Sequence, residues 1–365
     1  MSAAPHARQA AAPLLVRAAW GEPVERTPLW MMRQAGRLLP EYRALREQWS
    51  LLDISRQPDL AVRVTLQPLR RMPVDAAILF ADIMTPLDGI GVALDIVEGV
   101  GPVIESPVRS EADVRALRPL EPEADVPYVM ETLRTLRRQL DPDVALIGFA
   151  GAPFTLASYL IEGRPTRTFT RTKTMMYAAP ALWHELMERL GTITISYLRA
   201  QIAAGADAVQ LFDSWVGALA PDDYESYVAP HTTRIFAALR ETTHVPLIHF
   251  GVGTATLLEA MRANGATVIG LDWRVPLDEG WARVGHDLAV QGNLDPAILF
   301  APRSVISEKA GDVLRRAAGR PGHIFNLGHG ILPGTPLDGA IHLVHTVREQ
   351  SASIHAGSAP SLPLS

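Results

Sequence analysis

The sequence predicts a single-domain α/β fold of the (β/α)8 barrel type, with an active-site cleft at the carboxyl ends of its strands. Short apolar runs recur along the chain, and each is followed by a segment with helical periodicity, which is typical of parallel strands that alternate with helices. Polar residues follow closely where these runs end. In a barrel the carboxyl ends of the strands converge on one mouth, so these polar residues would meet there.

Seven apolar runs predict the strands, at 76–80, 144–149, 208–212, 245–250, 267–271, 289–292 and 323–327. One further short strand, not identified from the sequence, would complete a barrel of eight. Helical periodicity predicts helices that begin after Asp, Ser or Pro and end near Gly, at 126–140, 180–204, 222–242, 255–264, 305–318 and 337–349. A doubly wound open sheet is the alternative, but no G-x-G-x-x-G follows the first strand.

The domain limits follow from composition. Residues 1–19 are rich in alanine and read as a flexible leader whose last few residues start a helix, residues 20–350 form the barrel, and residues 351–365 form a disordered tail. Residues 92–108, which contain several glycines and prolines, predict a hairpin outside the barrel.

Composition excludes several classes of protein. A formal net charge of −5 argues against a nucleic-acid partner, although an acidic ligand still fits a locally positive cleft. The chain has no cysteine, which removes disulfides, thiolate metal sites and cysteine nucleophiles. No apolar run approaches the ~18 residues of a membrane span, and no secretory signal pattern is present, so we expect a cytoplasmic protein without a membrane partner.

Three long motifs carry a resemblance to a known family. They are PLWMMRQAGRLLPEYR at 28–43, GFAGAPFTLASYLIEG at 148–163 and NLGHGILP at 326–333. Their order and content resemble the uroporphyrinogen decarboxylase family. The resemblance implies a carboxy-lyase of porphyrin and haem biosynthesis that removes carbon dioxide from four acetate side chains of a tetrapyrrole, uroporphyrinogen III, and leaves methyl groups. It also implies a homodimer and no cofactor.

The first motif places two arginines on one turn that contains glycine, as Arg33, Gln34, Ala35, Gly36 and Arg37. Each guanidinium offers a planar fork of donors that matches a carboxylate. Taken alone, two arginines four residues apart are better explained as a solvated helix face, with partners such as Glu41. The resemblance implies instead that this loop holds the acidic side chains of the substrate.

Asp82 ends a strand among apolar neighbours, and its position fits a capping aspartate as well as a functional one. The resemblance implies that it points at the ring nitrogens of the substrate and stabilises a positive ring. It also implies substrate contacts, from the second motif and from the neighbouring strand ends, for Ile78, Phe149, Gly151, Tyr159, Phe212, Ser214 and His329.

The resemblance assigns catalysis to Asp82 and Arg37. Arg37, or a water that it orders, is the expected proton source, although arginine is a poor acid because its pKa exceeds ~12. Ser214 lacks the G-x-S-x-G frame of a hydrolase nucleophile.

Two histidine positions and two rival functions stay open. His342 and His345 have the spacing of metal ligands but lack an evident third ligand, so a solvated pair is expected, and His249 is a minor candidate for the mouth. A corrinoid-dependent methyltransferase of the same fold is the alternative enzyme, disfavoured because the chain lacks cysteine, and a non-catalytic tetrapyrrole carrier is a third class.

Overall fold

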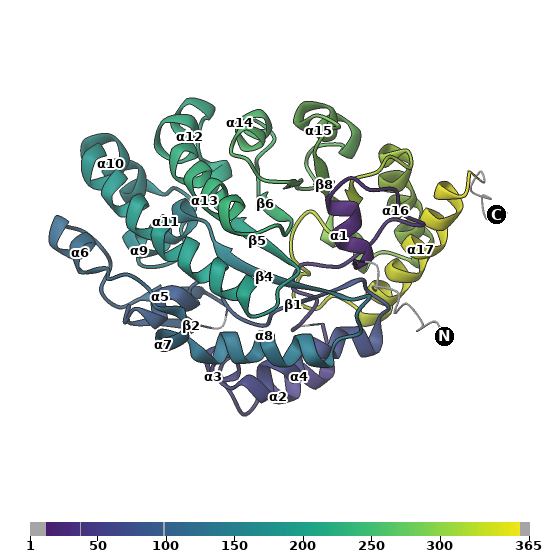
Figure 1. The fold of residues 1–365 in the computed structure, drawn as a ribbon, viewed down its shortest axis with the longest axis horizontal. Coiled ribbons are helices and arrows are strands. Elements are labelled where there is room, and N and C mark those ends of the chain that lie inside the picture. Colours follow the sequence, from purple (N-terminus) through teal and green to yellow (C-terminus); the bar gives the residue numbers. More distant parts are fainter. Residues whose placement is uncertain (1–11, 37, 98, 358–365) are drawn as a thin grey trace, which may run out of the picture.

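The structure is a computed structural model that describes residues 12–36, 38–97 and 99–357. In this part of the chain, seven parallel strands form one sheet in the order β1-β4-β5-β6-β7-β8-β9, so each strand lies next to its predecessor (Figure 1). All seven predicted strands are confirmed. They are β1 Ala76–Ile78, β4 Ala145–Gly151, β5 Ala208–Asp213, β6 Leu247–Gly251, β7 Val268–Gly270, β8 Ala289–Gln291 and β9 His323–Ile324.

The sheet is curled, and hydrogen bonds across its inside show this. Gln291 on β8 donates from Nε2 to Oε1 of Gln210 on β5 at 3.0 Å, and Nε1 of Trp30 donates to Oε1 of Gln291 at 2.9 Å. In a flat sheet β5 and β8 would lie about 14 Å apart, three strand spacings, which two glutamine side chains do not span. The inward faces of these strands therefore turn toward one another.

Residues 28–30 join the two edges of this sheet. The amide of Phe325, beside β9, donates to the carbonyl of Pro28 at 2.9 Å, and the amide of Trp30 donates back to the carbonyl of Phe325 at 3.3 Å. On the other side the amide of Asp75, next to β1, donates to the carbonyl of Leu29 at 2.8 Å. The first extended segment of the chain thus lies between the first and the last strands of the sheet.

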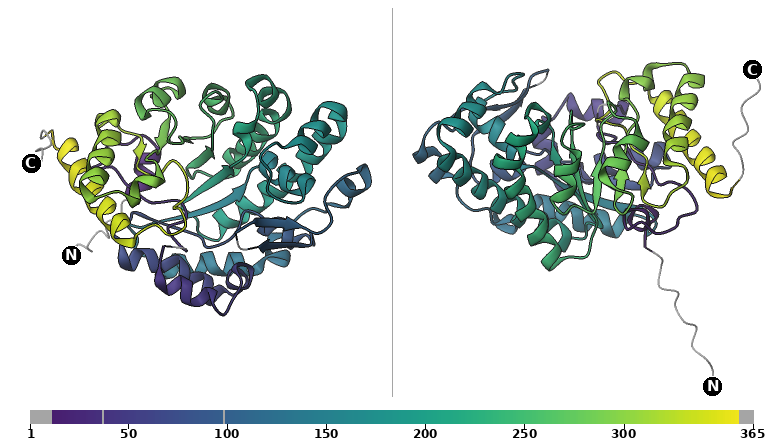
Figure 2. Two further views of the ribbon diagram at one scale, coloured as in Figure 1. Left: turned by 180° about the vertical axis from the view of Figure 1, so that it is seen from behind. Right: turned by 90° about the horizontal axis from the view of Figure 1, so that it is seen from above.

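Helices cover the outer face of the sheet, and the views in Figures 1 and 2 show them surrounding it on most sides. These helices lie between successive strands of the sheet along the chain, or after the last strand, and pack their apolar faces inward, as the sequence predicts. They are α8 Pro127–Gln139, α9 Pro153–Glu162, α11 Pro180–Ala203, α13 Ala229–Thr242, α14 Leu258–Ala263, α15 Leu277–Val284, α16 Arg303–Ala317 and α17 Leu337–His355.

The helix predicted over 222–242 is two helices, which corrects the prediction. Helix α12 covers Pro221–Tyr227, and α13 starts at Ala229 with Pro230 in its first turn. Proline has no amide hydrogen and clashes with the preceding turn, so a continuous helix is interrupted before it. Val228 takes the non-helical backbone angles between the two.

Helices lie at both predicted limits of the barrel, and the first of them is in the last residues of the leader, where a helix was predicted to start. Helix α1, Leu14–Ala19, contacts β4, β8 and β9, and Leu15 and Ala18 are fully buried in it. Helix α17 continues to His355, whose Nε2 lies 3.3 Å from Oγ1 of Thr27. Ordered structure therefore extends into the predicted leader and tail, because apolar residues in both segments pack against the sheet or its helices. Residues 1–11 and 358–365 lie outside the described residues.

The hairpin predicted over 92–108 is confirmed. Strands β2, Leu94–Val97, and β3, Gly101–Ile104, pair antiparallel apart from the main sheet. The amide of Ile104 donates to the carbonyl of Gly163, which ties the hairpin to the end of α9.

The sequence prediction named no helix at several places where the structure has short ones. Two of them start with a capping box, because the side chain of Ser50 or Ser110 bonds to the aspartate three residues on. These helices are α2 Pro40–Arg46, α3 Leu51–Arg56, α4 Pro58–Arg71, α5 Thr85–Gly89, α6 Glu111–Ala116, α7 Pro122–Asp125 and α10 Thr170–Ala178.

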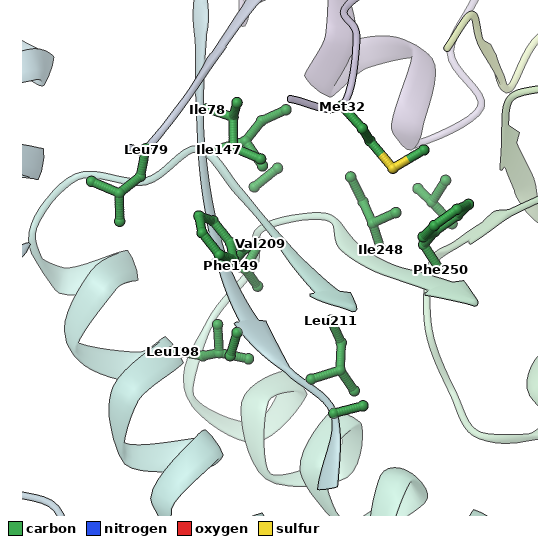
Figure 3. Packing of buried hydrophobic residues seen from close by; sticks show 14 of the residues in the cluster. Met32, Ile78, Leu79, Ile147, Phe149, Leu198, Val209, Leu211, Ile248 and Phe250 are labelled. Atoms are coloured by element: carbon green, nitrogen blue, oxygen red, sulfur yellow. The ribbon is translucent and has the colours of Figure 1, made fainter. Parts of the chain in front are cut away.

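The interior of the sheet is packed with side chains from several strands. Figure 3 shows Met32, from the extended segment, projecting toward the space between Ile78 of β1 and Ile248 of β6. Met32 also receives a hydrogen bond on its sulfur from Nε2 of Gln210 at 3.7 Å. In the described residues no helix is both long and apolar enough to cross a membrane.

Candidate active site

The arginine loop begins where residues 28–32 end, and its own glutamine fixes it. Gln34 is fully buried. Its Oε1 accepts from the amide of Met31 at 2.9 Å, and its Nε2 donates to the carbonyl of Ala76 on β1 at 2.8 Å. The amide of Met32 donates to Oδ1 of Asn326 at 3.1 Å. The side chain predicted to contact substrate at position 34 therefore bonds to the protein and anchors the loop.

Arg33 has an unusual backbone conformation for a residue that is not glycine. Its φ of 64° lies in the left-handed region, a conformation that costs of order 1–3 kcal/mol for most residues. Gly36, with φ 138°, makes the second sharp turn, and Ala35 between them is half-buried. The structure places Arg33 against the third motif, because a Cβ at Gly330 would lie 2.8 Å from Cγ of Arg33. Arg37 lies outside the described residues.

Asp82 follows β1 and is half-buried. Its Oδ1 accepts from the amide of Met84 at 2.9 Å, and its own amide donates to Oγ1 of Thr85 at 3.3 Å. Burial raises the pKa of the Asp82 carboxyl above its ordinary value, while the Met84 amide and the charge of Arg33 act in the opposite direction. One carboxylate oxygen of Asp82 therefore caps the turn at Met84. The carboxyl is also near enough to Arg33 for the guanidinium charge to affect its pKa.

Tyr159 on α9 lies in the same region. It is 8% exposed, and burial raises the pKa of its phenol to about 12, so the hydroxyl stays protonated at neutral pH. The charges of Asp82 and Arg33 both act on the phenol, which places these three residues near one another. The ring meets the edge of Trp215 at a centroid distance of 5.9 Å.

Ser214 directly follows β5, in a turn that a buried hydrogen-bond chain holds. Asp213 is fully buried, and its Oδ1 accepts from Oγ1 of Thr155 at 2.9 Å. Oγ1 of Thr155 in turn accepts from the amide of Trp215 at 3.3 Å. The residues on both sides of Ser214 are therefore fixed to α9, and Ser214 itself is half-buried.

An aromatic wall lines the inside of the sheet near its carboxyl end. Phe149 of β4 meets Phe212 of β5 edge to face at 5.5 Å, and Phe212 meets Phe250 of β6 at 6.1 Å. Ile78 lies on the neighbouring strand β1 and points inward in Figure 3. Gly151 ends β4 where an added Cβ would fall 2.7 Å from the Leu156 side chain. A flat apolar ligand face would fit against this wall.

His329 lies between two glycines and is half-buried. Its Nδ1 accepts from the amide of Gly330 at 2.7 Å, which assigns the ring proton of the neutral form to Nε2. Burial and the charge of Arg33 lower the pKa of His329, so the imidazole is neutral at neutral pH. It therefore presents an N–H donor rather than a positive charge.

The first and third motifs meet at this point, together with the turn after β7. A Cβ at Gly328 would fall 2.3 Å from the amide nitrogen of Trp273, so the two turns touch through their backbones. The Trp273 ring meets His329 edge to face at 6.1 Å. The structure thus brings Arg33, Asp82 and His329 to one edge of the sheet from three distant parts of the sequence.

The two minor histidine candidates lie elsewhere. His249 is fully buried, and its ring packs against Phe236 of α13 at 5.4 Å, so it faces the helices rather than the mouth. His342 bonds through Nε2 to Oγ of Ser307 at 2.8 Å and to the carbonyl of Arg303 at 3.1 Å. No group of three or more potential metal ligands gathers anywhere in the described ranges.

Comparison with known proteins decides the family. The chain matches the family model described as uroporphyrinogen decarboxylase (URO-D) over residues 11–350. The chain belongs to the uroporphyrinogen decarboxylase family. The family match begins nine residues before the predicted start of the barrel, consistent with the packed helix α1.

Curated relatives extend over almost the whole chain. The uroporphyrinogen decarboxylase of Thermobifida fusca is 58% identical over 334 residues, which cover 91% of this chain and 92% of that protein. The one from Carboxydothermus hydrogenoformans is 54% identical over 326 residues, or 89% and 93% of the two chains. The one from Thermus thermophilus is 55% identical over 339 residues, with 93% and 98% covered.

Among solved structures, a methyltransferase from Methanosarcina mazei has a TM-score of 0.77 at 19% identity, covering 92% of this chain and 97% of that one. A B12-independent methionine synthase from Shewanella has a TM-score of 0.55 at 13% identity, with 84% and 89% covered. At these identities the likeness is one of fold alone.

Sequence reasoning about this uroporphyrinogen decarboxylase family member missed the residues that hold the site in place. Thr155 lies inside the second motif, and a threonine two residues after a helix-starting proline is a signal for a bond back to a strand end. Trp215 and Trp273 each follow closely after a strand, at the edge where the mouth was expected. A search for residues that closely follow the predicted strands would have identified Trp215 and Trp273.

Proposed function

We propose that this chain decarboxylates uroporphyrinogen III to coproporphyrinogen III by removing carbon dioxide from its four acetate side chains. The observation that carries this is the placement of Arg33, whose side chain packs against Gly330 next to His329 and whose charge also acts on Asp82 and Tyr159. Arg33, Tyr159 and His329 lie in the three motifs, and the family match extends over residues 11–350, which include Asp82.

Loss of carbon dioxide leaves an electron pair on the former acetate carbon, and most decarboxylases supply a cofactor to accept it. A pyrrole ring accepts the pair itself once a proton has been added to its α-carbon, because the protonated ring is iminium-like. The bond to the carboxylate carbon then breaks, and its electron pair neutralises the ring. A proton taken up by the exocyclic methylene gives the methyl group, and release of the α-proton restores the pyrrole.

Asp82 stabilises the positive ring in this scheme. A carboxylate at the strand end accepts N–H bonds from the ring and attracts the charge that protonation creates. One oxygen of Asp82 is held by the Met84 amide, which fixes the direction of the group before substrate arrives. Such preorganisation lowers the barrier because little rearrangement is needed at the moment of reaction.

The acidic side chains of the substrate are held by Arg33, Arg37, Ser214 and His329 in this proposal. The neutral His329 donates from Nε2 to a carboxylate, and the protonated phenol of Tyr159 donates similarly. Arg37, or a water that it orders, supplies the proton to the ring. A desolvated site favours this transfer, since arginine holds its proton strongly in water.

We also propose that residues 28–30 act as the eighth strand of a closed single-domain (β/α)8 barrel. Support comes from the hydrogen bonds that join Pro28, Leu29 and Trp30 to both edges of the sheet. We further propose a cytoplasmic homodimer, as family analogy suggests, and light scattering of the purified chain measures its mass.

The rival function is corrinoid-dependent methyl transfer, and the fold likeness to a methyltransferase prompts it. Members of that group resemble one another in binding zinc through histidine and cysteine. This chain has no cysteine and keeps the arginine loop, so decarboxylation is the better account.

Purified protein incubated anaerobically with uroporphyrinogen III tests the proposal, with chromatography of the oxidised products. We expect intermediates that have lost one to three carboxyl groups, and then coproporphyrin. Unchanged substrate in the presence of folded protein would contradict the proposal, and transfer of a methyl group from a methylcorrinoid to a thiol would favour the rival.

A further inference from the structure

Arg274 lies in the turn after β7, at the edge of the sheet that carries the candidate active site. The turn reads Leu271, Asp272, Trp273, Arg274, and it touches the third motif where Gly328 packs on Trp273. Trp273 also contacts the ring of His329. Arg274 is therefore a near neighbour of the residues proposed to bind substrate, although it lies outside the three motifs.

The side chain of Arg274 is held in one place by its own turn. Its guanidinium carbon stacks 3.9 Å above the Trp273 ring, and its Nη1 donates to Oδ2 of Asp272 at 2.8 Å. Asp272 is 3% exposed, and it accepts further bonds from the backbone amides of Gly253 and Arg274. A long side chain that is already ordered loses little conformational entropy when it binds a ligand.

The guanidinium of Arg274 also keeps donors available. An arginine has five N–H donors. The side-chain bonds described for Arg274 use one nitrogen, and the side chain is 49% exposed. Its charge reaches the site, because Arg274 and, more strongly, Arg33 both lower the pKa of His329. Arg274 therefore lies close enough to His329 for its charge to act there, although Asp272, its ion-pair partner, acts on the pKa of His329 in the opposite direction.

We propose that Arg274 is a further substrate-binding residue, which grips a carboxylate of the tetrapyrrole at the rim of the site. The proposal rests on the proposed function, because it takes the ligand to be a macrocycle with acidic groups around its periphery. The aromatic wall receives the face of such a ring inside the sheet. Its peripheral acids then reach outward to the rim, where the free edge of the Arg274 fork matches a carboxylate.

The alternative is that Arg274 is a surface residue whose only role is to form an ion pair with Asp272. Only the arginine of this ion pair is half-exposed, whereas Asp272 is buried, so removing the arginine takes the cation away from a buried carboxylate that two backbone amides still bond. The two accounts differ in what a substitution changes. A structural role predicts a loss of thermal stability without a specific loss of affinity, whereas a binding role predicts weaker binding that depends on salt.

The test compares Arg274→Gln and Arg274→Lys with the parent chain in equilibrium binding of uroporphyrin, the inert oxidised form of the substrate, followed by its fluorescence. Arg134→Gln is the matched control, because Arg134 on α8 has a similar exposure of 47% and pairs with Glu123. Circular dichroism and thermal melts verify folding. Arg274→Lys keeps the charge next to Asp272 and serves if the glutamine variant folds poorly.

We expect Arg274→Gln to raise Kd about five- to tenfold at low ionic strength, equivalent to about 1–1.4 kcal/mol. The lysine variant should fall between the parent and the glutamine variant, because it loses the planar fork but keeps the charge. The ratio of variant to parent Kd should shrink in high salt, since a half-exposed charge is screened. In turnover, KM should rise in parallel while kcat stays within about twofold.

A Kd for Arg274→Gln within about twofold of both parent and Arg134→Gln at low salt would overturn the proposal. So would a fall in kcat with unchanged KM, because that pattern assigns the residue to the chemical step. Absence of turnover by the parent chain instead overturns the proposed function, and the binding comparison separates the two failures.

Discussion

Replacing Asp82 by asparagine should slow turnover strongly and leave the fold intact. The side-chain amide keeps the shape and one acceptor oxygen, so it still receives the bond from the Met84 amide that Asp82 receives at 2.9 Å. What it loses is the negative charge. In the proposed mechanism that charge attracts a ring cation that exists only after protonation, so the loss should appear in kcat.

The expected size follows from electrostatics. Opposite unit charges about 4 Å apart attract by about 4 kcal/mol at an effective dielectric constant near 20. Removal of one preorganised group in other enzymes costs about 10²- to 10³-fold in kcat, or ~2.7–4 kcal/mol. We therefore expect Asp82→Asn to lower kcat by about 10²- to 10³-fold. Asp82→Glu should lose less, because the charge remains but is displaced by one methylene.

The same substitution should not lower thermal stability at neutral pH. Burial raises the pKa of Asp82 in the folded state, so folding favours its protonated form. A carboxyl with a raised pKa contributes stability below its unfolded pKa, and that contribution is lost as pH rises through the folded value. Asparagine carries no charge, so the variant avoids the cost of burying an ionised carboxyl.

Steady-state turnover, circular dichroism and thermal melts of the parent, Asp82→Asn and Asp82→Glu measure these effects together. If the asparagine variant turns over near the parent rate, Asp82 is only the cap of the turn at Met84, and the proposed role in catalysis fails. If its Tm falls by many degrees, the kinetic result reports folding instead, and the stability argument is wrong.

Four other outcomes are expected. Arg33→Lys or Arg37→Lys keeps a charge but loses the fork, and each should cost roughly 1.5–3 kcal/mol in kcat/KM, whereas near-normal kinetics would show that charge alone suffices. Gly330→Ala places a Cβ 2.8 Å from Cγ of Arg33, so KM should rise while the melt stays close to the parent's, and an unchanged KM would show that Arg33 moves aside freely. Burial lowers the pKa of His323 to about 4, so the unfolded state takes up that proton first. The free energy of unfolding should then fall by about 3 kcal/mol between pH 6.5 and 4, and denaturant titrations of His323→Gln should show a shallower fall. Exhaustive chelation should leave turnover intact, and a loss that added zinc or magnesium reverses would refute a metal-independent reaction.

The strands were predictable from the sequence because each is a short run buried on both sides. β4, for example, is buried at every residue, and no polar residue interrupts the apolar run that predicts it. Residues 28–30 were not predicted to join the sheet because their hydrogen bonds are to Phe325 and Asp75, which lie far away in the sequence. The apolar run at 29–32 is short and lies inside the first motif, and it gives no local sign of such distant partners.

Helix ends were harder to predict than helices. A proline at the first turn of α13 divides what periodicity presents as one helix, since hydrophobic spacing continues through the break. Helix α1 was assigned mainly to a leader because alanine-rich sequence carries little pattern, and only contact with β9 and its neighbours reveals its role.

At the site, the motifs nominated candidate residues, and the structure shows which of them bond to the protein itself. Gln34 belongs to the arginine motif, yet its amide bonds to Ala76. The sequence contains no sign of whether a polar side chain in a motif faces the ligand or the protein. Arg274 was not considered either, because it lies outside the three motifs, although it follows β7 closely at the edge where polar residues were expected to meet.

The position of residues 28–30 between β1 and β9 has a consequence for how the chain folds. Leu29 and Phe325 pair across nearly the full length of the sequence, so the ribosome must finish almost the entire chain before that pairing forms. Until then residues 28–30, which bond to Asp75 on one side, keep an open edge on the side that pairs with Phe325, and Arg33 and His329 remain apart. A nascent or truncated chain would therefore hold helices and most of the sheet but no assembled site, and its exposed strand edge is a template for aggregation. Assembly of the site is then the last event of folding rather than an early one.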